Sequence, residues 1–172
     1  DILCVDIPQA CAGYVVGLMQ SFMLLEHMEG KKVLLCTGET FCRGNKEKQE
    51  PPYYRAPFGG DAANITIVEN AGNEKVYYEF HQDGSQRKCL VIPDGAFRNP
   101  MTVEQIQNQI VRMPLTGVVM DGSTVFNFAQ KEVPILVDSL TKMAETTKED
   151  IDWFLFHQPN KFMLQKLAER IG

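Results

Sequence analysis

Apolar positions along this chain follow two patterns: short continuous runs, and repeats every three or four residues. Continuous runs are typical of strands, whereas the wider spacing is typical of a helix with one apolar face. The runs predict strands at residues 2–7, 32–37, 65–69, 76–81, 115–120 and 153–156. The wider spacing predicts helices from Cys11 to Gly30, from Thr102 to Val111, from Ser123 or Gly122 to Glu145 and from Pro159 to Gly172.

The order of these segments indicates the fold class. A strand, a helix and a strand come first, further strands follow, and a helix, a strand and a helix end the chain. This order is typical of an α/β protein with mostly buried strands. We therefore expect the strand at 32–37 to be buried and parallel, and the mostly apolar first helix to lie in the interior.

The sequence also predicts local structure at a few individual residues. Gly30 is placed to cap the first helix, and another backbone is expected to pass close to Gly13 and Gly17. Pro134 is expected to kink the long helix in which it lies. His81, which precedes the turn residues Gln82 to Ser85, is expected to anchor that turn.

Cys11 is the first candidate for chemistry. Small residues flank its thiol on both sides, Ala10 before it and Ala12 and Gly13 after it. Free backbone N–H groups at the start of the following helix favour an anion, and a thiolate is a nucleophile. The competing interpretation is a buried, unreactive thiol, because free cysteines are among the most buried residue types.

His157 occupies an equivalent position in the second part of the chain, where an apolar strand again runs into a helix. Ligands of open α/β sheets bind at the carboxyl ends of strands. If two such ends meet at one crevice, Cys11 and His157 come together there. A nucleophile and a partner base at one crevice would form a catalytic pair.

Composition narrows the possible functions. Apolar residues make up 44% of the 172 residues. The net charge is −5, which excludes the basic surface that nucleic-acid binding requires. No apolar run is long enough for a membrane helix, and the opening residues lack a basic secretory signal. The 5 cysteines include no C-x-x-C pair, so we expect no metal site and a cytoplasmic protein with reduced thiols.

Motifs at residues 10–14, 58–63, 120–126 and 156–160 occur in one order. Together they resemble ketoacyl-[acyl-carrier-protein] synthase III of the thiolase superfamily, along essentially the whole chain. The resemblance implies an α/β, thiolase-like fold of two similar halves, with layered sheets and buried helices. Residues 1–100 would be the remainder of the N-terminal half with the nucleophile, and residues 101–172 the start of the C-terminal half with the catalytic histidine.

The reaction implied by this resemblance is a decarboxylating Claisen condensation. Cys11 would take an acyl group from acyl-CoA, and malonyl-[acyl-carrier protein] would lose carbon dioxide and attack the acyl-cysteine. His157 would stabilise the enolate, with a second donor from an asparagine further along the family's chain. The substrates would be acyl-CoA and malonyl-carrier protein, without any cofactor.

The resemblance also implies binding residues and partners. Gly122 and Asn160 match positions near the pantetheine arm, and the stretch that begins at Gln158 matches the surface presented to the carrier protein. The family commonly has an arginine where Phe162 stands, and here the positive charge lies next to it on Lys161. The full-length parent is expected to be a homodimer.

Two other functions remain open. A cysteine hydrolase would fit the spacing from Cys11 to His157, although the papain-type signature around the cysteine is absent. A non-catalytic partner subunit would keep the fold without the chemistry. We also expect this chain to be a fragment lacking the start of the first half and the end of the second. Such a fragment is expected to be inactive alone and to self-associate through exposed sheet edges.

Overall fold

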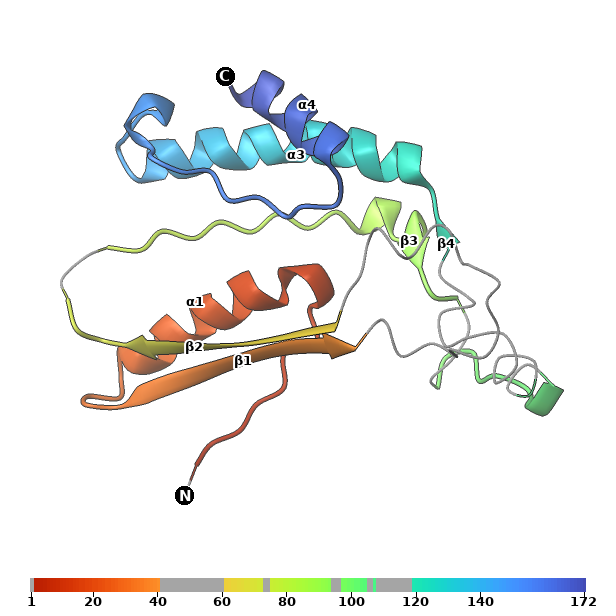
Figure 1. Ribbon diagram of the computed structural model, residues 1–172, viewed down its shortest axis with the longest axis horizontal. Coiled ribbons are helices and arrows are strands. Elements are labelled where there is room, and N and C mark those ends of the chain that lie inside the picture. Colours follow the sequence, from red (N-terminus) through yellow and green to blue (C-terminus); the bar gives the residue numbers. More distant parts are fainter. Residues whose placement is uncertain (1, 41–60, 73–74, 94–96, 105–106, 108–118) are drawn as a thin grey trace. The chain divides into compact units, whose positions relative to one another are not determined.

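The structure is a computed structural model, and it describes residues 2–40, 61–72, 75–93, 97–104, 107 and 119–172 (Figure 1). The described residues form two compact units. Unit 1 contains those up to residue 78, and unit 2 contains those from residue 79 onward. The division into thiolase-like halves at residue 100 stays a prediction.

Unit 1 is one helix packed on a two-stranded sheet. A 3-10 turn, η1 (Ala10–Ala12), leads into α1 (Gly13–Leu25), and the strands are β1 (Lys32–Thr40) and β2 (Asp61–Glu69). The strands pair antiparallel in a ladder that runs from Lys32 opposite Glu69 to Thr40 opposite Asp61. An ion pair of 2.6 Å joins the Lys32 and Glu69 side chains at one end of the ladder.

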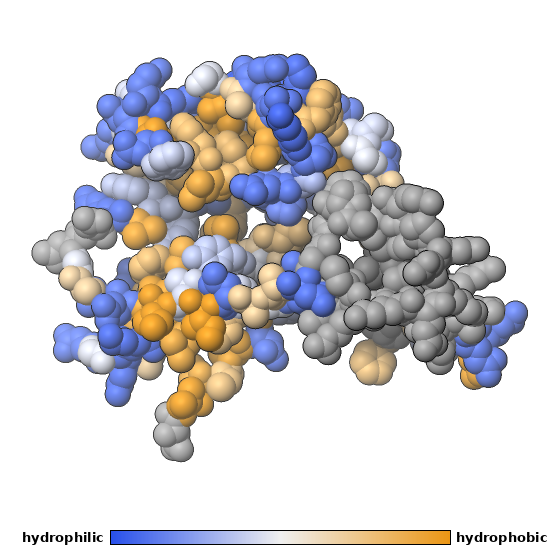
Figure 2. Space-filling view, viewed as in Figure 1, coloured by the Kyte–Doolittle hydropathy of each residue, from blue (hydrophilic) through white to orange (hydrophobic). Residues whose placement is uncertain are grey.

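Strand alternation gives this sheet one covered and one open face. Leu35 and Val68 are 9% and 5% exposed and share the face on which α1 packs. The residues on the opposite face are exposed, among them Leu34 and its ladder partner Ile67. Apolar atoms consequently remain at the surface of this unit (Figure 2).

Several expectations for unit 1 are wrong. The strand at 32–37 is antiparallel and largely exposed, because its ladder partner is the following strand and a single helix covers the sheet. α1 buries only one stripe, Gly17, Ser21 and Leu25, for the same reason. It ends at Leu25, so Gly30 is not its cap but lies in the turn before β1 with a left-handed φ of 66°.

Close packing at Gly17 involves a side chain and not a neighbouring backbone. A Cβ added at Gly17 would lie 2.6 Å from the Leu35 Cδ1 atom and 3.4 Å from the Ile7 Cδ1 atom. The missing side chain thus lets α1 approach β1 closely. Beside Gly17, the Ser21 hydroxyl donates to the Gly17 carbonyl at 2.7 Å, which satisfies this buried polar group.

Unit 2 contains two long helices. η2 (Gly84–Gln86) precedes β3 (Leu90–Val91), which pairs antiparallel with β4 (Val119–Met120). α3 (Gly122–Met143) follows β4 directly, and the 3-10 turn η3 (Lys148–Asp150) and α4 (Lys161–Ile171) complete the unit. The core is Met163, Leu167 and Ile171 of α4, packed against Val125, Phe126, Ala129, Val133 and Val137 of α3 and against Phe156.

The two predicted helices of unit 2 that the structure describes in full, α3 and α4, are confirmed, with limits set by their caps. Asp121 caps α3 by accepting from the backbone N–H groups of Ser123 and Thr124. α3 ends in a Schellman arrangement, in which Glu145 has a left-handed φ of 53° and the Thr146 N–H donates to the Thr141 carbonyl. Asn160 caps α4, so Pro159 lies just before this helix and not at its first position.

Pro134 removes a backbone donor in the middle of α3, and α4 replaces it. Proline has no N–H, so the carbonyl of Gln130, four residues earlier, has no helical partner. The Arg170 guanidinium donates to that carbonyl at 3.2 Å, and the buried Gln130 amide donates to the Met163 carbonyl at 3.5 Å. α3 continues through Pro134. The proline therefore creates a site that binds α3 to α4.

Three segments predicted as strands are not strands among the described residues: 2–7, 76–81 and 153–156. A strand needs a ladder partner for its backbone groups, and none of these segments has one in that part of the chain. The helix at 102–111, the strand at 115–118, Cys42 and the motif residues Phe58 to Gly60 lie wholly or mainly outside the described residues.

Candidate functional site

Cys11 lies in the middle of η1, immediately before α1. Its side chain is exposed, which contradicts the interpretation of a buried thiol. The Ala12 N–H donates to the Gln9 carbonyl at 3.0 Å, and the Gly13 N–H donates to the Ala10 carbonyl. These bonds form a tight turn that presents the thiol to solvent at the start of a helix.

The turn before Cys11 is strained. Ala10 has a φ of 45°, in the left-handed region that L-amino acids rarely adopt. Left-handed backbone at a non-glycine residue costs roughly 1–2 kcal/mol, and such residues concentrate at functional sites. No signal in the sequence indicated this conformation, because alanine has no preference for it.

His157 is exposed and follows Phe156, which packs against the α4 core. The Asn160 side chain accepts from the Met163 N–H at 2.8 Å, so three residues after His157 the backbone is fixed as a helix start. One packed residue before the histidine and one cap after it thus position the loop that carries His157.

Unit 2 brings together the ends of the two helices that carry the predicted binding residues. Gly122 is the first residue of α3, and Lys161 is the first residue of α4. Phe126 and Phe162, each in the first two turns of its helix, stack with ring centroids 5.6 Å apart. Gly122, Gln158, Asn160 and Lys161 are all exposed near this contact, and a Cβ at Gly122 would meet nothing within 4 Å.

A cleft of about 270 Å³ lies between α3 and α4. Its lining combines one aromatic ring with amide and charged groups: Phe126, Asn127, Gln130, Lys131, Lys166, Glu169 and Arg170. The motifs and residue spacing of the sequence did not indicate these residues. Pro134 was the available signal, because a proline inside a helix leaves a carbonyl for another group to bind.

Cys11 lies in unit 1 and His157 lies in unit 2. Their meeting at one crevice therefore stays a prediction. Within the described ranges, no three histidine, cysteine, aspartate or glutamate side chains are grouped so that they could hold a metal ion. None of the helices in those ranges is both long and apolar enough to cross a membrane.

Comparison with known proteins gives a consistent result. A relative in Campylobacter jejuni, assigned as a 3-oxoacyl-[acyl-carrier-protein] synthase 3, is 30% identical over 171 residues, which are 96% of this chain and 47% of the relative. The beta-ketoacyl-[acyl-carrier-protein] synthase III of Synechocystis is 28% identical over 97% of this chain and 49% of its own length. No protein-family model matches the sequence.

Comparison with solved structures gives the same result as comparison of the sequences. A crystal structure of a 3-oxoacyl-(acyl-carrier-protein) synthase III superposes with a TM-score of 0.75 and 30% identity, over 94% of this chain and 49% of that chain. In sequence and fold, the chain resembles half of a synthase III. A 3-oxoacyl-(acyl-carrier protein) synthase from Burkholderia xenovorans superposes with a TM-score of 0.69 and 28% identity, over 94% of this chain and 45% of that chain.

These matches confirm the resemblance to synthase III and the thiolase-like α/β fold, which is present in part. The chain spans about half the length of the curated relatives it matches. The matched half includes both Cys11 and His157, because the alignments cover almost the entire chain.

Proposed function

We propose that this chain is part of an enzyme that condenses acyl-CoA with malonyl-[acyl-carrier protein], as a synthase III does. The observation that carries the proposal is the match over 94% of the chain at a TM-score of 0.75 and 30% identity. The exposed thiol of Cys11 and the exposed ring of His157 support it, because both reactive groups are accessible to large substrates.

Cys11 would carry the acyl group. Its sulfur would attack the thioester carbonyl of acyl-CoA, CoA would leave as the thiol, and the acyl group would remain on Cys11 as a thioester. The backbone N–H of Cys11 is a candidate donor to the tetrahedral oxyanion. A thiolate is both a good nucleophile and a good leaving group, so the acyl group can be passed on.

His157 would act in the second step. The malonyl thioester would lose carbon dioxide, and an imidazole N–H directed at the thioester oxygen would stabilise the resulting enolate. The electron pair on the α-carbon would then form a bond to the acyl carbonyl, and Cys11 would leave as the thiolate. This role requires His157 to face Cys11 in the complete protein.

Binding of the pantetheine arm is assigned to the region where α3 and α4 begin. Gly122 leaves open space at the first residue of α3, and Asn160 and Gln158 offer exposed amide groups at and just before the start of α4. Lys161 supplies a positive charge for an acidic carrier protein. No cofactor takes part in this proposed reaction, and the complete protein is proposed to be a cytoplasmic homodimer.

Acyl transfer to the 172-residue chain tests the proposal. After incubation with acetyl-CoA, peptide mass spectrometry should find one acetyl group on Cys11 and none in the Cys11→Ser variant. Cys36→Ser is the matched control, because it removes another exposed thiol of unit 1 and should leave the labelling intact. Equal labelling of Cys36, or peptide cleavage without acyl transfer, would contradict the proposal.

Catalytic turnover by the 172-residue chain is a question separate from acyl transfer to Cys11. Because the chain spans about half of its relatives, the 172 residues alone are proposed to have negligible condensing activity. Sustained release of carbon dioxide from malonyl-[acyl-carrier protein] by this chain would contradict that part of the proposal and leave the assignment of Cys11 intact.

A further inference from the structure

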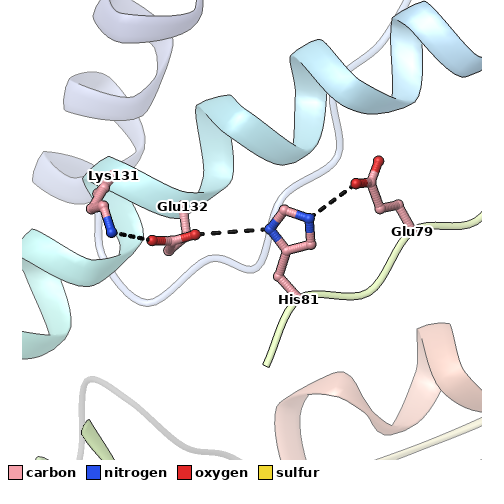
Figure 3. Close-up of polar contacts among 4 residues, drawn as sticks. All are labelled: Glu79, His81, Lys131 and Glu132. Carbon is pink, nitrogen blue, oxygen red and sulfur yellow. Dashed lines mark hydrogen bonds and ion pairs between the residues drawn. The ribbon is translucent and has the colours of Figure 1, made fainter. Parts of the chain in front are cut away.

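Residues 79–91, called the strap here, lie along α3 in unit 2 and are attached to it at both ends. At the C-terminal end of the strap, here called the far end, β3 pairs with β4, and the Asp121 N–H donates to the Cys89 carbonyl at 2.7 Å. At the near end, residues 79–83 are in no helix or strand, so side chains make the attachment there (Figure 3). The near end is therefore the weaker of the two.

The attachment at the near end is a histidine between two carboxylates. The Nε2 atom of His81 lies 3.0 Å from the Glu79 Oε1 atom, and its Nδ1 atom lies 3.8 Å from the Glu132 Oε2 atom of α3 (Figure 3). A neutral imidazole carries one N–H, whereas the imidazolium carries two. Favourable contacts to both carboxylates at once therefore require the protonated ring.

Lys131 and Asp83 extend this cluster of charges. Lys131 lies 2.8 Å from the other oxygen of Glu132, so Lys131, Glu132, protonated His81 and Glu79 form a row of alternating charges (Figure 3). Asp83, in the strap, also attracts Lys131. When the ring is neutral, this row loses one of its two cations.

Glu79 and Asp83 keep their charge near neutral pH because the pKa of each is lowered. A hydrogen bond from the Ser139 side chain, followed by the contact with His81, holds the pKa of Glu79 below its ordinary value. The pKa of Asp83 is also lowered, chiefly by the side chain and N–H of Ser85. Histidine is the side chain that ordinarily changes charge between about pH 5 and 8.

We propose that Glu79, His81 and Glu132 form a pH-sensitive clasp, which fastens the strap to α3 while His81 is protonated and loosens as the pH rises. The strap leads into β3, and β3 pairs with the strand that immediately precedes Asp121 and Gly122. Release of the clasp would expose the strap without unfolding the α3–α4 core, which the clasp does not touch.

Limited proteolysis tests the clasp, because the strap contains two trypsin sites, Arg87 and Lys88. Cleavage there would be measured at about pH 6 and about pH 8, spanning the histidine range. A synthetic peptide of residues 84–91, digested alongside, corrects for the pH dependence of trypsin itself. When opening is fast, cleavage reports the population of the open state. We expect corrected cleavage of the chain to be about two- to fivefold faster at the higher pH, the effect of one partly exposed ion pair.

Variants identify the responsible group. His81→Gln should be cleaved at the same corrected rate at both pH values, and Glu132→Gln, which keeps the histidine, should show a reduced pH dependence. His27→Gln is the matched control, because it removes a histidine of unit 1 and should behave as the unaltered chain does. A pH-independent unaltered chain, or a His81→Gln variant that keeps the pH dependence, would overturn the proposal. The assay requires no condensing activity, so its outcome is independent of the proposed function.

Discussion

Asp121 shows how far one side chain can determine the start of a long helix. Its Oδ1 atom accepts from the backbone N–H groups of Ser123 and Thr124 at 3.1 Å each, and the Thr124 hydroxyl donates to Oδ2 at 2.6 Å. These bonds favour the ionised carboxylate and lower the pKa of Asp121 from 3.8 to about 2, with the Thr124 hydroxyl as the largest cause. The residue before Gly122 is thus held in one orientation.

This lowered pKa predicts a pH dependence of stability. A carboxyl group whose pKa is lower in the folded state contributes stability above its unfolded pKa and loses it as the pH falls through the folded pKa. For Asp121 the loss should occur from about pH 4 down to about pH 2. Asp121→Asn cannot titrate, so the difference in melting temperature between the unaltered chain and this variant should shrink over that range.

Thermal melts followed by circular dichroism would measure that difference. Asp152→Asn is the control, since Asp152 is an exposed acid of the same unit outside any helix cap. A difference between the unaltered chain and Asp121→Asn that stays constant from pH 7 to pH 2 would show that the cap bonds do not depend on the charge.

At the scale of elements, the contact of Arg170 with Gln130 depends on a defect in α3. Pro134 leaves the Gln130 carbonyl without a helical donor, and Arg170 of α4 supplies one. Lys148 of η3 adds a second link at the same, C-terminal end of α4 by donating to the Ile171 carbonyl at 3.0 Å. α4 is therefore held by polar bonds around its apolar core contacts.

If Arg170 compensates for Pro134, their substitutions should be coupled. Pro134→Ala restores a helical N–H and should stabilise unit 2 by up to about 3 kcal/mol. Arg170→Met should cost about 1 kcal/mol in the unaltered chain, the net value of one hydrogen bond, and clearly less in the Pro134→Ala background. Urea unfolding of the four proteins gives the coupling free energy.

Lys166→Met is the matched control for this cycle, because Lys166 pairs with Glu169 on the same helix and not with α3. Its effect should be the same in both backgrounds. Equal costs of Arg170→Met with and without Pro134 would show that the arginine acts independently of the proline.

Local signals explain which elements could be predicted. The helices of unit 2 were predictable because their start signals are local in sequence, such as Asp121 before α3 and Asn160 before α4. Strand pairing is not local: nothing in residues 32–37 indicates that their partner is the antiparallel strand at 61–69. The segment at 153–156 has the apolar pattern of a strand, but that pattern cannot supply a ladder partner.

The candidate site likewise contains residues that could be predicted from the sequence and features that could not. Cys11 and His157 were predicted at strand-to-helix junctions, and each does lie shortly before a helix, but the segments 2–7 and 153–156 that precede them are not strands. The left-handed backbone at Ala10 was not predictable, because alanine has no preference for that conformation. The clasp at His81 depends on how the strap lies on α3, which a linear sequence does not indicate.

At the scale of the whole molecule, apolar surface remains uncovered in both units. In unit 1, the open face of the sheet exposes Leu34, Ile65 and Ile67 by 63%, 66% and 62%. In unit 2, alternate residues of one segment, Trp153 and Leu155, are exposed by 81% and 86%. Contiguous apolar patches and unpaired strand-like backbone favour association between molecules.

We therefore predict that the 172-residue chain self-associates. Light scattering should give an average mass above the 19.4 kDa of one chain, and this mass should rise with concentration. Ile67→Lys combined with Leu155→Lys should lower it, because each lysine would have to lose its hydration to be buried in a contact. Gln165→Lys is the control, since it adds a positive charge at an exposed polar position of α4 and should leave the mass unchanged. A monodisperse monomer at every concentration would contradict the prediction and show that these exposed faces do not drive association.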